Sequence, residues 1–465
     1  MKICVLQPSY ENSDIDYKNF DPPREISTLI PDARFHYEFL KKATVYKQLK
    51  NLKKENFDIY VNLCEGSLDW DTPSIDVIHA LESLNLPYTG PTTNLYDPSK
   101  ELMKYVAYTV SVPTPDFVPV KTESDIELVD NNLKYPLFIK PGHAGDSLGI
   151  DLNSRVETRE ELYSKTKLLL EEFDSILVEE YIEGREFSVL VLSNVENSFA
   201  PIALRPLEFV FPKGTFFKTY KLKTTEYHPE CNIPSSDPAL NEKLTSAAKS
   251  IFAAFEGAGY ARMDFRVDKN GNIFFLEVNF ACSVFYKEGY YGTADYILQH
   301  DGFGPSNFLK HIIQEGISRH NSRQNKYYSK KNGVSGYGIF ALCDIAKGEV
   351  VFQGENKPQR IATKKYIEKN WKEEKQIENF KKFAYPIGNE VFILWDENPA
   401  NWAPQNHACN ANTGFDGLNI IALKDINKDS ELTLDYTIFY GKEMDPFECN
   451  CGAPSCKKII RGRSH

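Results

Sequence analysis

The chain has 465 residues, of which 42% are apolar and 13% aromatic, and its formal net charge at pH 7 is -11. This length exceeds what one hydrophobic core supports, so two to four structural units are expected, and the apolar content excludes an intrinsically disordered chain. The negative charge argues against general nucleic-acid binding, which needs a basic surface, and no apolar run is long enough to span a bilayer. Nine cysteines without a recognisable secretory signal predict a cytoplasmic, reducing location, with thiols free or bound to metal.

Residues 1–115 are expected to form a small N-terminal βα domain. The apolar runs at residues 2–6 and 57–63 are typical of buried strands, and the apolar spacing across residues 74–84 predicts a helix. Such an alternation of strands and helices favours an α/β arrangement. Pro113 and Pro115 mark the end of this segment.

Residues 116–316 are richer in strand patterns and extend the α/β or α+β class to a second, larger domain. The predicted strands are residues 135–140, 175–180, 187–192 and 273–279. A Lys269-Asn270-Gly271 turn precedes the last of these strands and predicts that it closes a β-hairpin.

A candidate metal site lies on this predicted hairpin. Glu277 and Asn279 are two residues apart on one strand, so their side chains project together, while Leu276 and Val278 are expected to face the core. Asp264 on the paired strand could complete an oxygen cluster, and hard oxygen ligands suit Mg²⁺ held jointly with substrate phosphates. For any one of these residues taken alone, an ordinary polar position is the better interpretation.

Lys140 ends a predicted strand and is followed by a glycine-rich stretch, residues 141–149, which contains Ser147. Backbone N–H groups in such a loop can bind phosphate oxygens, and a nearby lysine adds a point charge. A glycine-rich turn alone is a weak signal. Here it precedes the carboxylate pair in an order that could build one nucleotide site.

Together these residues resemble the ATP-grasp ligases, specifically the D-alanine–D-alanine ligase type, over residues 1–316. The resemblance is carried by residues 84–91, by Asp97-Pro98-Ser99-Lys100, and by residues 179–187 around Glu179-Glu180-Tyr181-Ile182. It implies ATP- and Mg²⁺-dependent ligation of a carboxylate to an amine, in which phosphorylation of the carboxylate precedes attack by the amine. Amino-acid or peptide substrates are implied with it.

The same resemblance assigns roles to individual positions. The implied nucleotide-binding residues are Lys100, Lys140, Ser147, Glu179, Glu180, Ile182, Glu186 and Lys223. The implied Mg²⁺ ligands are Asp264, Glu277 and Asn279, and Arg262 is implied near the transferred phosphate. After Asn279 the chain departs from the family, because residues 280–283 read Phe-Ala-Cys-Ser where a Ser-Pro-Gly turn usually holds a substrate carboxylate. Glu11 is only a candidate for the family's early substrate glutamate.

Residues 317–332 are polar and basic, and residues 318–332 contain no acidic residue. The preferred interpretation is a solvated linker, and a phosphate-binding patch is the less favoured alternative. Beyond it, short strands and glycine turns predict a compact, mostly β unit over residues 333–465.

Three thiols, those of Cys449, Cys451 and Cys456, lie close together near the end of this unit, and Cys409 is expected to be a fourth. Four cysteines in reducing surroundings are typical of a closed, structural, tetrahedral Zn²⁺ site. Unliganded core cysteines explain three thiols in a polar segment poorly, and a redox C-x-x-C pair is absent from the sequence.

The run Gly336-Tyr337-Gly338, the pair Asn406-His407 and Tyr436 could each be ordinary structural residues. In this order, together with the four cysteines, they resemble the SET domain of lysine methyltransferases with its cysteine-rich post-SET tail. The resemblance implies a zinc-stapled tail, a protein lysine as methyl acceptor and Tyr436 as the catalytic tyrosine. The implied S-adenosylmethionine contacts are Gly336, Tyr337, Gly338, Asn406 and His407.

Three functional hypotheses follow. The preferred one is a bifunctional ligase and lysine methyltransferase, because both residue sets are substantially intact. The altered turn at residues 280–283 motivates an alternative, a methyltransferase whose ATP-grasp half binds or regulates. A third, a ligase whose SET half is an interaction module, draws slight support from Phe352 and Leu434, which replace residues common in the family. No nucleic-acid or membrane partner is expected, and the oligomeric state is left open, with a homodimer as one option.

Overall fold

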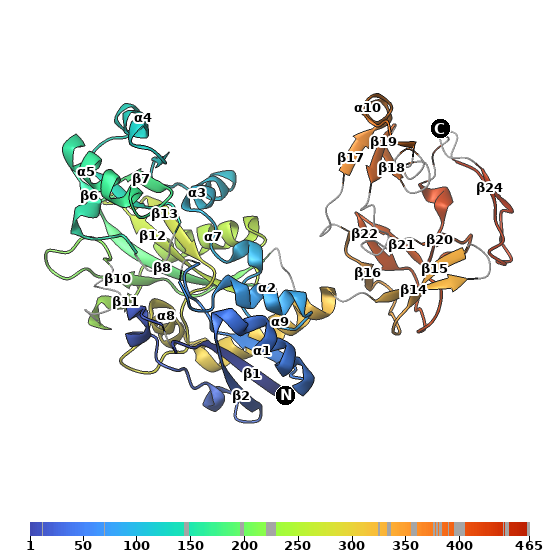
Figure 1. The fold of residues 1–465 in the computed structure, drawn as a ribbon, viewed down its shortest axis with the longest axis horizontal. Helices are drawn as coiled ribbons and strands as arrows, with labels where there is room; N and C mark the ends of the chain where they lie inside the picture. The colour runs from blue at the N-terminus through green and yellow to red at the C-terminus, as the bar shows by residue number, and fades with distance from the viewer. Residues whose placement is uncertain are drawn as a thin grey trace. The chain divides into compact units, whose positions relative to one another are not determined.

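A computed structural model gives the fold of the chain (Figure 1). It describes residues 1–462 except 12, 69, 144–147, 196–199, 220–228, 324–325, 333–335, 355–359, 375–376, 378–379, 381–383, 389, 395–404, 440 and 442–445. The chain divides into two compact units, Met1–His320 and Asn321–His465. None of the described helices has the length and apolar character that crossing a bilayer requires.

The N-terminal part of the first unit is a parallel three-stranded sheet in the order β2-β1-β3. Its elements are β1 (Lys2–Pro8), β2 (Arg34–Leu40), β3 (Ile59–Asn62), α1 (Val45–Leu52) and α2 (Ile75–Ser83). Cys4 and Leu6 share a core with α1 and α2, whereas Ile3 and Val5 enter a second core on the opposite face. Burial on both faces explains the continuous apolar run, and the two strands and the helix predicted here are confirmed.

A second, antiparallel sheet has the order β4-β7-β5-β6. Its elements are β4 (Phe117–Val120), β5 (Leu137–Pro141), β6 (Arg155–Val156) and β7 (Ile176–Glu180), with α4 (Ile126–Asn132) and α5 (Arg159–Leu170) on one face. Leu137 and Ile139 of β5 pack in the core with these helices. The residues that alternate with them, Phe138 and Lys140, therefore leave the sheet on the other face.

The central sheet of the first unit is antiparallel in the order β11-β10-β8-β12-β13, with β9 also paired to β8. Its strands are β8 (Arg185–Leu192), β9 (Ile202–Ala203), β10 (Leu207–Phe209), β11 (Asn232–Pro234), β12 (Tyr260–Val267) and β13 (Ile273–Asn279). The helices that pack on it are α3 (Lys100–Thr109), α7 (Pro238–Ala254), α8 (Thr293–Asp301) and α9 (Gly304–Arg323). The predicted β12–β13 hairpin is confirmed.

Alternation along β12 positions the polar side chains of this sheet. Ala261, Met263, Phe265 and Val267 all belong to the core that α3 and α7 cover. The alternate residues, from Tyr260 through Arg262 and Asp264 to Arg266, face away from that core. One strand therefore carries an apolar face for folding and a polar face for function.

A β-bulge in β13 corrects one expectation. The register passes from Asp264↔Glu277 to Phe265↔Phe275, which leaves Leu276 as the extra residue. Val278 is 1% exposed and faces the core as expected, but Leu276 lines the same cleft as Glu277. The prediction that Leu276 faces the core was wrong, because a bulge breaks the two-residue alternation on which it rested.

The second unit consists of short strands in several small sheets, in the orders β14-β15, β16-β22-β21, β17-β19-β18, β20-β23 and β24-β25. The strands are β14 (Tyr327–Asn332), β15 (Gly336–Ala341), β16 (Val350–Phe352), β17 (Arg360–Thr363), β18 (Tyr385–Gly388), β19 (Val391–Leu394), β20 (Asn406–His407), β21 (Thr413–Asp416), β22 (Asn419–Ala422), β23 (Thr433–Leu434), β24 (Phe447–Glu448) and β25 (Ile459–Ile460). Among them lie the α-helix α10 (Lys364–Asn370) and the short 3-10 helix η11 (Tyr436–Ile438).

Residues 317–332, expected to be a solvated linker, are mostly regular structure. Residues 317–323 complete α9, and Tyr327–Asn332 form β14, which pairs with β15 in antiparallel register. The apolar face of α9 explains the helix, because Phe308, Ile312 and Ile313 are buried in the core of the first unit. Polar composition alone did not distinguish a solvated linker from solvated faces of a helix and a strand.

Candidate functional site

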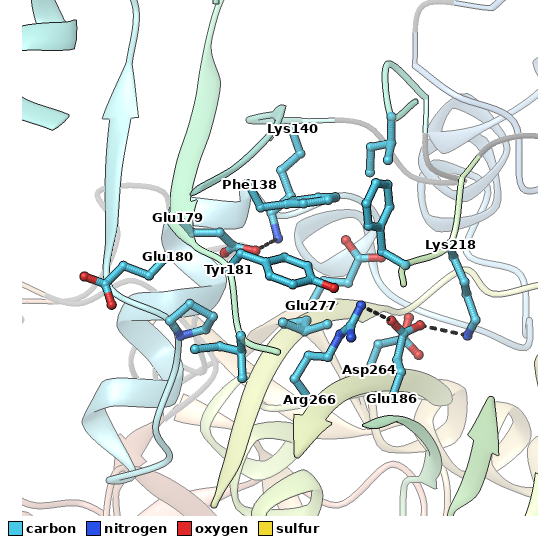
Figure 2. Close-up of a pocket in the computed structure, with 15 residues that line it drawn as sticks. Phe138, Lys140, Glu179, Glu180, Tyr181, Glu186, Lys218, Asp264, Arg266 and Glu277 are labelled. Atoms are coloured by element: carbon cyan, nitrogen blue, oxygen red, sulfur yellow. Dashed lines mark hydrogen bonds and ion pairs between the residues drawn. The ribbon is translucent and has the colours of Figure 1, made fainter. Parts of the chain in front are cut away.

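A cleft of about 630 Å³, open to solvent, lies where residues of the β4–β7 sheet meet those of the central sheet. Figure 2 shows its lining side chains. Among the predicted site residues, those that line it are Lys140, Glu179, Glu180, Ile182, Glu186, Asp264 and Glu277. The fold therefore brings together residues separated by more than a hundred positions. Ser147 and Lys223 lie outside the described residues.

Glu179 is the buried centre of one end of this cleft. Lys140 donates a hydrogen bond to Glu179 Oε1 at 2.6 Å (Figure 2), and Lys104 Nζ lies 2.9 Å from Oε2. Burial by itself would raise the pKa of Glu179, but the charges of Lys104 and Lys140 outweigh it and lower the pKa. Lys104 was not predicted as a site residue. Its only signal was a position four residues after Lys100, on the same face of a helix.

The first predicted lysine begins α3. The Oγ of Ser99 accepts the backbone N–H of Leu102 at 3.1 Å and caps the helix. Lys100 follows directly, is 4% exposed, and places its Nζ 3.9 Å from Glu277 Oε2. The cap therefore fixes where this buried cation meets the central sheet.

The opposite end of the cleft is arranged around Glu186. Lys218 Nζ lies 3.1 Å from Glu186 Oε1, and Arg266 Nη2 lies 3.3 Å from Oε2 (Figure 2). Arg266 also donates to the backbone oxygens of Gly184, at 3.0 Å, and Phe216, at 2.7 Å. Neither Lys218 nor Arg266 was predicted, because each contacts Glu186, which is distant from both in the sequence.

The predicted metal ligands meet across the β12–β13 hairpin. Asp264 is opposite Glu277, and Arg262 is opposite Asn279. Asp264 accepts hydrogen bonds from Ser188 Oγ at 2.6 Å and from Arg262 Nη2 at 3.1 Å. Two carboxylates and one amide oxygen form the hard donor set that Mg²⁺ prefers.

The buried amide of Asn279 has one group that the fold leaves without a partner. Asn279 Nδ2 has no hydrogen-bond partner in the part of the chain that the structure describes. Its N–H group can donate to an oxygen of a bound ligand, while Oδ1 is the atom that can bind a metal ion. The donor set fits a Mg²⁺ ion between Asp264, Glu277 and Asn279.

A second cavity of about 300 Å³ is lined by residues of the N-terminal sheet and of the central sheet. Tyr260 lines it from the central sheet, Cys282 from the segment after β13, and Arg24 and Glu65 from the N-terminal part. Arg24 donates to Glu65 Oε1 at 2.7 Å and lies 3.1 Å from Asp21 Oδ1. Burial raises the pKa of the Cys282 thiol to about 12, so this side chain is a neutral wall and not a nucleophile.

Glu11, the candidate substrate glutamate, does not line either cavity. Its carboxylate is exposed and pairs with Lys41 at 2.5 Å. Glu65 is the carboxylate that the fold places beside the second cavity. The sequence run Leu63-Cys64-Glu65-Gly66, directly after β3, could have suggested it, because functional groups gather where parallel strands end.

In the second unit, three predicted segments meet. Asn406 and His407 form β20, which pairs in parallel with Thr433 and Leu434 of β23. Asn406 Nδ2 donates to the backbone oxygen of Tyr337 and to Glu431 Oε1, both at 2.8 Å. The fold thus gathers the start of β15, the Asn406-His407 pair and the segment before Tyr436.

Gly338 lies against the side chains of two of these segments. A Cβ atom at this position would lie 2.3 Å from Glu431 Oε1 and 3.1 Å from Asn406 Nδ2. A larger residue would therefore displace the Glu431 carboxylate and disturb its hydrogen bond with Asn406. The structure places Tyr337 largely in solvent, at 71% exposure, and Gly336 pairs with Asn332 at the end of the β14–β15 ladder.

Tyr436 is held at both ends. Its backbone N–H donates to His407 Nδ1 at 3.0 Å, and its hydroxyl donates to the backbone oxygen of Gln405. Burial lowers the pKa of His407, so the ring is neutral near pH 7 and its proton is on Nε2, which lies 3.3 Å from Cys409 Sγ. His407 therefore connects the tyrosine to the cysteines.

The four predicted cysteines form one cluster. The Sγ atoms of Cys409, Cys449, Cys451 and Cys456 all lie within 4.8 Å of one another, and those of Cys409 and Cys449 are 3.8 Å apart. A Zn–S bond of about 2.3 Å in a regular tetrahedron places sulfurs about 3.8 Å apart, so the cluster fits Zn²⁺. The prediction that Cys409 joins the three C-terminal cysteines is confirmed.

Comparisons with known proteins match both units. Residues 106–288 match the family described as D-ala D-ala ligase C-terminus, and residues 336–437 match the SET domain. The chain is 34% identical over 201 residues to a D-alanine–D-alanine ligase of Aquifex aeolicus, which covers 43% of this chain and 64% of that protein, less than two thirds of its length. It is 30% identical over 272 residues to the same ligase of Carboxydothermus hydrogenoformans, covering 55% of this chain and 83% of that protein.

Solved structures extend the match to the fold. The crystal structure of a D-alanine–D-alanine ligase from Bacillus anthracis complexed with ATP aligns with a TM-score of 0.50 and 19% sequence identity. The alignment covers 70% of this chain and 99% of that one. At this identity the likeness concerns the fold, and it confirms the ATP-grasp architecture expected of the first unit.

Proposed function

Because the chain belongs to the D-alanine–D-alanine ligase family and also carries a SET domain, we propose that it is a bifunctional enzyme. Its first unit is an ATP- and Mg²⁺-dependent carboxylate–amine ligase. Its second unit is an S-adenosylmethionine-dependent lysine N-methyltransferase. The observation that carries the ligase half is the convergence of Lys140, Glu179, Asp264 and Glu277 on one cleft.

In the ligase half, ATP when bound supplies the phosphoryl group that activates a carboxylate for attack by an amine. Lys100 and Lys140 neutralise phosphate charge, and Asp264, Glu277 and Asn279 hold Mg²⁺. Glu186 at the other end of the cleft accepts hydrogen bonds from the sugar. Arg262, between the two cavities along β12, stabilises charge where the phosphoryl group is transferred.

The second cavity is proposed to hold the carboxylate substrate. Arg24, Asp21 and Glu65 together carry one net negative formal charge beside it, which favours a substrate with an ammonium group. Amino acids or peptides with a free amine meet this requirement. The Phe-Ala-Cys-Ser sequence at residues 280–283 leaves D-alanine itself without its usual turn, so the substrate identity is a separate question.

A titration with MgATP tests the ligase half. Calorimetry is expected to show saturable binding by the full chain, and Glu277→Gln is expected to weaken MgATP binding about 10- to 100-fold because one charged metal ligand is lost. Glu208→Gln is the matched control, since Glu208 pairs with Arg185 away from the cleft lining. Absence of ATP binding by the wild-type protein would remove this half of the proposal and leave the regulatory-module alternative without a nucleotide ligand.

In the methyltransferase half, S-adenosylmethionine when bound supplies an electrophilic methyl group. Gly338, Asn406 and His407 shape its site, and Tyr436 orients a neutral lysine amine toward the methyl carbon. Methyl transfer requires the two reactants in line, so positioning supplies most of the rate. Zn²⁺ held by the four cysteines fixes the tail beside this site, and a thiol metal site of this kind fits a cytoplasmic, reducing compartment.

Gly338→Ala is expected to weaken S-adenosylmethionine binding about 10-fold or more, because the added methyl displaces Glu431 and with it the Asn406 amide. Equilibrium dialysis or calorimetry measures the change. Gly348→Ala is the control, since a Cβ at that turn meets nothing within 4 Å, although its φ of +85° carries local strain. Equal binding by the wild type and Gly338→Ala would contradict the assignment of the site.

The second candidate function is a methyltransferase whose ATP-grasp half is a binding or regulatory module. The specific observation in its favour is the buried, neutral Cys282 in the turn that usually holds a substrate carboxylate. Such a protein would bind MgATP without releasing ADP when mixtures of amino acids are supplied. Under either function, the proposed domains are residues 1–115, 116–316 and 333–465. Residues 317–332, which hold the end of α9 and strand β14, lie between the last two in the sequence.

A further inference from the structure

Lys104 is a buried cation for which the mechanism above has no use. It is 1% exposed, it does not line the cleft, and its Nζ donates to the backbone oxygen of Phe275 at 3.2 Å. Its charged partner is Glu179, whose Oε2 lies 2.9 Å away. An ammonium group is rarely buried to this extent unless its charge is needed where it lies.

Lys104 and Lys100 stand one helical turn apart on α3. Residues four positions apart share a helix face, so both side chains point toward the same region. Lys100 approaches Glu277 of β13, and Lys104 approaches Glu179 of β7. One helix therefore delivers a cation to each of the two sheets that bound the cleft.

Glu179 is shared between two lysines with different freedom. Lys140 donates to Oε1 at 2.6 Å and lines the open cleft, so it can turn toward a ligand there. Lys104 is enclosed on the other side and is anchored to Phe275, so it cannot. If Lys140 moved away and no second cation were present, the Glu179 carboxylate would be left buried and unpaired, which is strongly unfavourable.

We propose that Lys104 is a positioning residue that keeps Glu179 paired when Lys140 turns from this carboxylate to the phosphates of bound ATP. Lys104 thereby lowers the free-energy cost of moving Lys140, without touching the nucleotide itself. The proposal rests on the nucleotide site proposed above. It concerns binding of ATP and predicts no direct part for Lys104 in phosphoryl transfer.

The charges around Lys104 agree with this role. Glu179 of β7 and Glu277 of β13 face it as anions, while Lys140 of β5 faces it as a cation. Burial lowers the pKa of Lys104 to about 8, with the repulsion from Lys140 acting in the same direction and the attraction of Glu179 against it. Below this pH the ammonium is present and can hold Glu179. Above it the charge is lost progressively.

The test is a double-mutant cycle on the full chain, read by calorimetry with MgATP. Lys104→Met is expected to weaken MgATP binding roughly 10- to 100-fold, the range for losing one charged partner. In the Glu179→Gln background, where no carboxylate needs a counter-ion, the same substitution is expected to change binding less than about 3-fold. Turnover at saturating ATP is expected to change much less than KM, because Lys104 does not touch the reacting groups.

Lys42→Met is the matched control. Lys42 is a half-buried lysine with a carboxylate partner, Asp76 at 3.2 Å, and it lines neither the cleft nor the second cavity. Its substitution is expected to leave MgATP affinity unchanged. Thermal unfolding of each variant checks that the chain still folds. If Lys104→Met alone does not fold, the Glu179→Gln/Lys104→Met double variant, which lacks both charges of this ion pair, is compared with Glu179→Gln instead.

Each outcome is decisive. If the wild type binds MgATP and Lys104→Met binds it within about 2-fold, the inference is wrong while the proposed nucleotide site stands. An equal loss with and without Glu179→Gln also overturns it, because Lys104 would then act on the nucleotide directly. Wild-type affinity should also fall as the pH rises from 7.5 to 9, and this fall should be absent in Lys104→Met. A wild type that does not bind ATP overturns the nucleotide site and the inference together.

Discussion

Replacing Arg262 with methionine is expected to lower ATP-dependent turnover about 10³-fold while changing MgATP affinity only slightly, because its charge is needed at the transferring phosphoryl group. Burial acts to lower the pKa of Arg262, but the neighbouring Asp264 outweighs it and raises the pKa, so the guanidinium stays charged at every working pH. On β12 it stands between Tyr260, which lines the smaller cavity, and Asp264, which lines the larger. ADP release measured against ATP concentration separates turnover from affinity.

Arg266→Met is the contrasting variant for this experiment. Arg266 lies on the same strand and is equally cationic, but it is bound to Glu186 and to two backbone oxygens at the far end of the cleft. Its loss is expected to raise KM for ATP more than it lowers turnover. If both variants reduced turnover to the same degree, Arg262 would have no special position relative to the reacting atoms.

Removing metal from the cysteine cluster is expected to abolish methyl transfer and to loosen the backbone at Tyr436. Structural zinc sites contribute apparent binding free energies of about 10–16 kcal/mol, so the folded tail depends on the ion. The loss would reach Tyr436 by two routes. His407 joins Cys409 Sγ to the Tyr436 amide, and Lys457, which follows Cys456, donates from its backbone to Cys409 Sγ and from its Nζ to Thr437 Oγ1.

Hydrogen exchange measures this effect without relying on activity. The Tyr436 amide should exchange slowly in the zinc-loaded chain, and at least about 10-fold faster after chelation or in Cys451→Ser. Cys343→Ser is the control, because this cysteine is exposed and outside the cluster. Metal analysis should find bound zinc lost in Cys451→Ser alone. Unchanged protection of Tyr436 after complete zinc removal would show that the cluster does not support the methyl site.

Much of the ligase cleft could be predicted because its residues lie on regular strands. The strand positions of Asp264, Glu277 and Asn279 fix which side chains share a face, and the hairpin turn fixes their pairing. Lys104 and Lys218 escaped prediction for the opposite reason. A lysine in a sequence carries no sign of the carboxylate that it will meet across the fold, and Glu179 is distant in sequence from Lys104.

The second unit shows the same limit. The spacing of Cys449, Cys451 and Cys456 predicted a metal cluster, and Cys409 joined it as expected. The contact of Glu431 with Asn406 was not predicted, because the acid lies in another segment and its role depends on the parallel pairing of β20 with β23. A parallel pair is a long-range contact that local sequence patterns do not encode.

The alternation along β12 fixes the distances between the polar side chains proposed for the ligase reaction. Side chains on one face recur about every 6.8 Å, so Tyr260, Arg262, Asp264 and Arg266 span about 20 Å from the smaller cavity to the far end of the cleft. Their spacing is set by the covalent backbone. Deleting one residue in the middle of β12 would turn part of this polar row into the core and bring Met263 or Phe265 into the cleft. Evolution can therefore exchange side chains along this row far more readily than it can change the length of the strand.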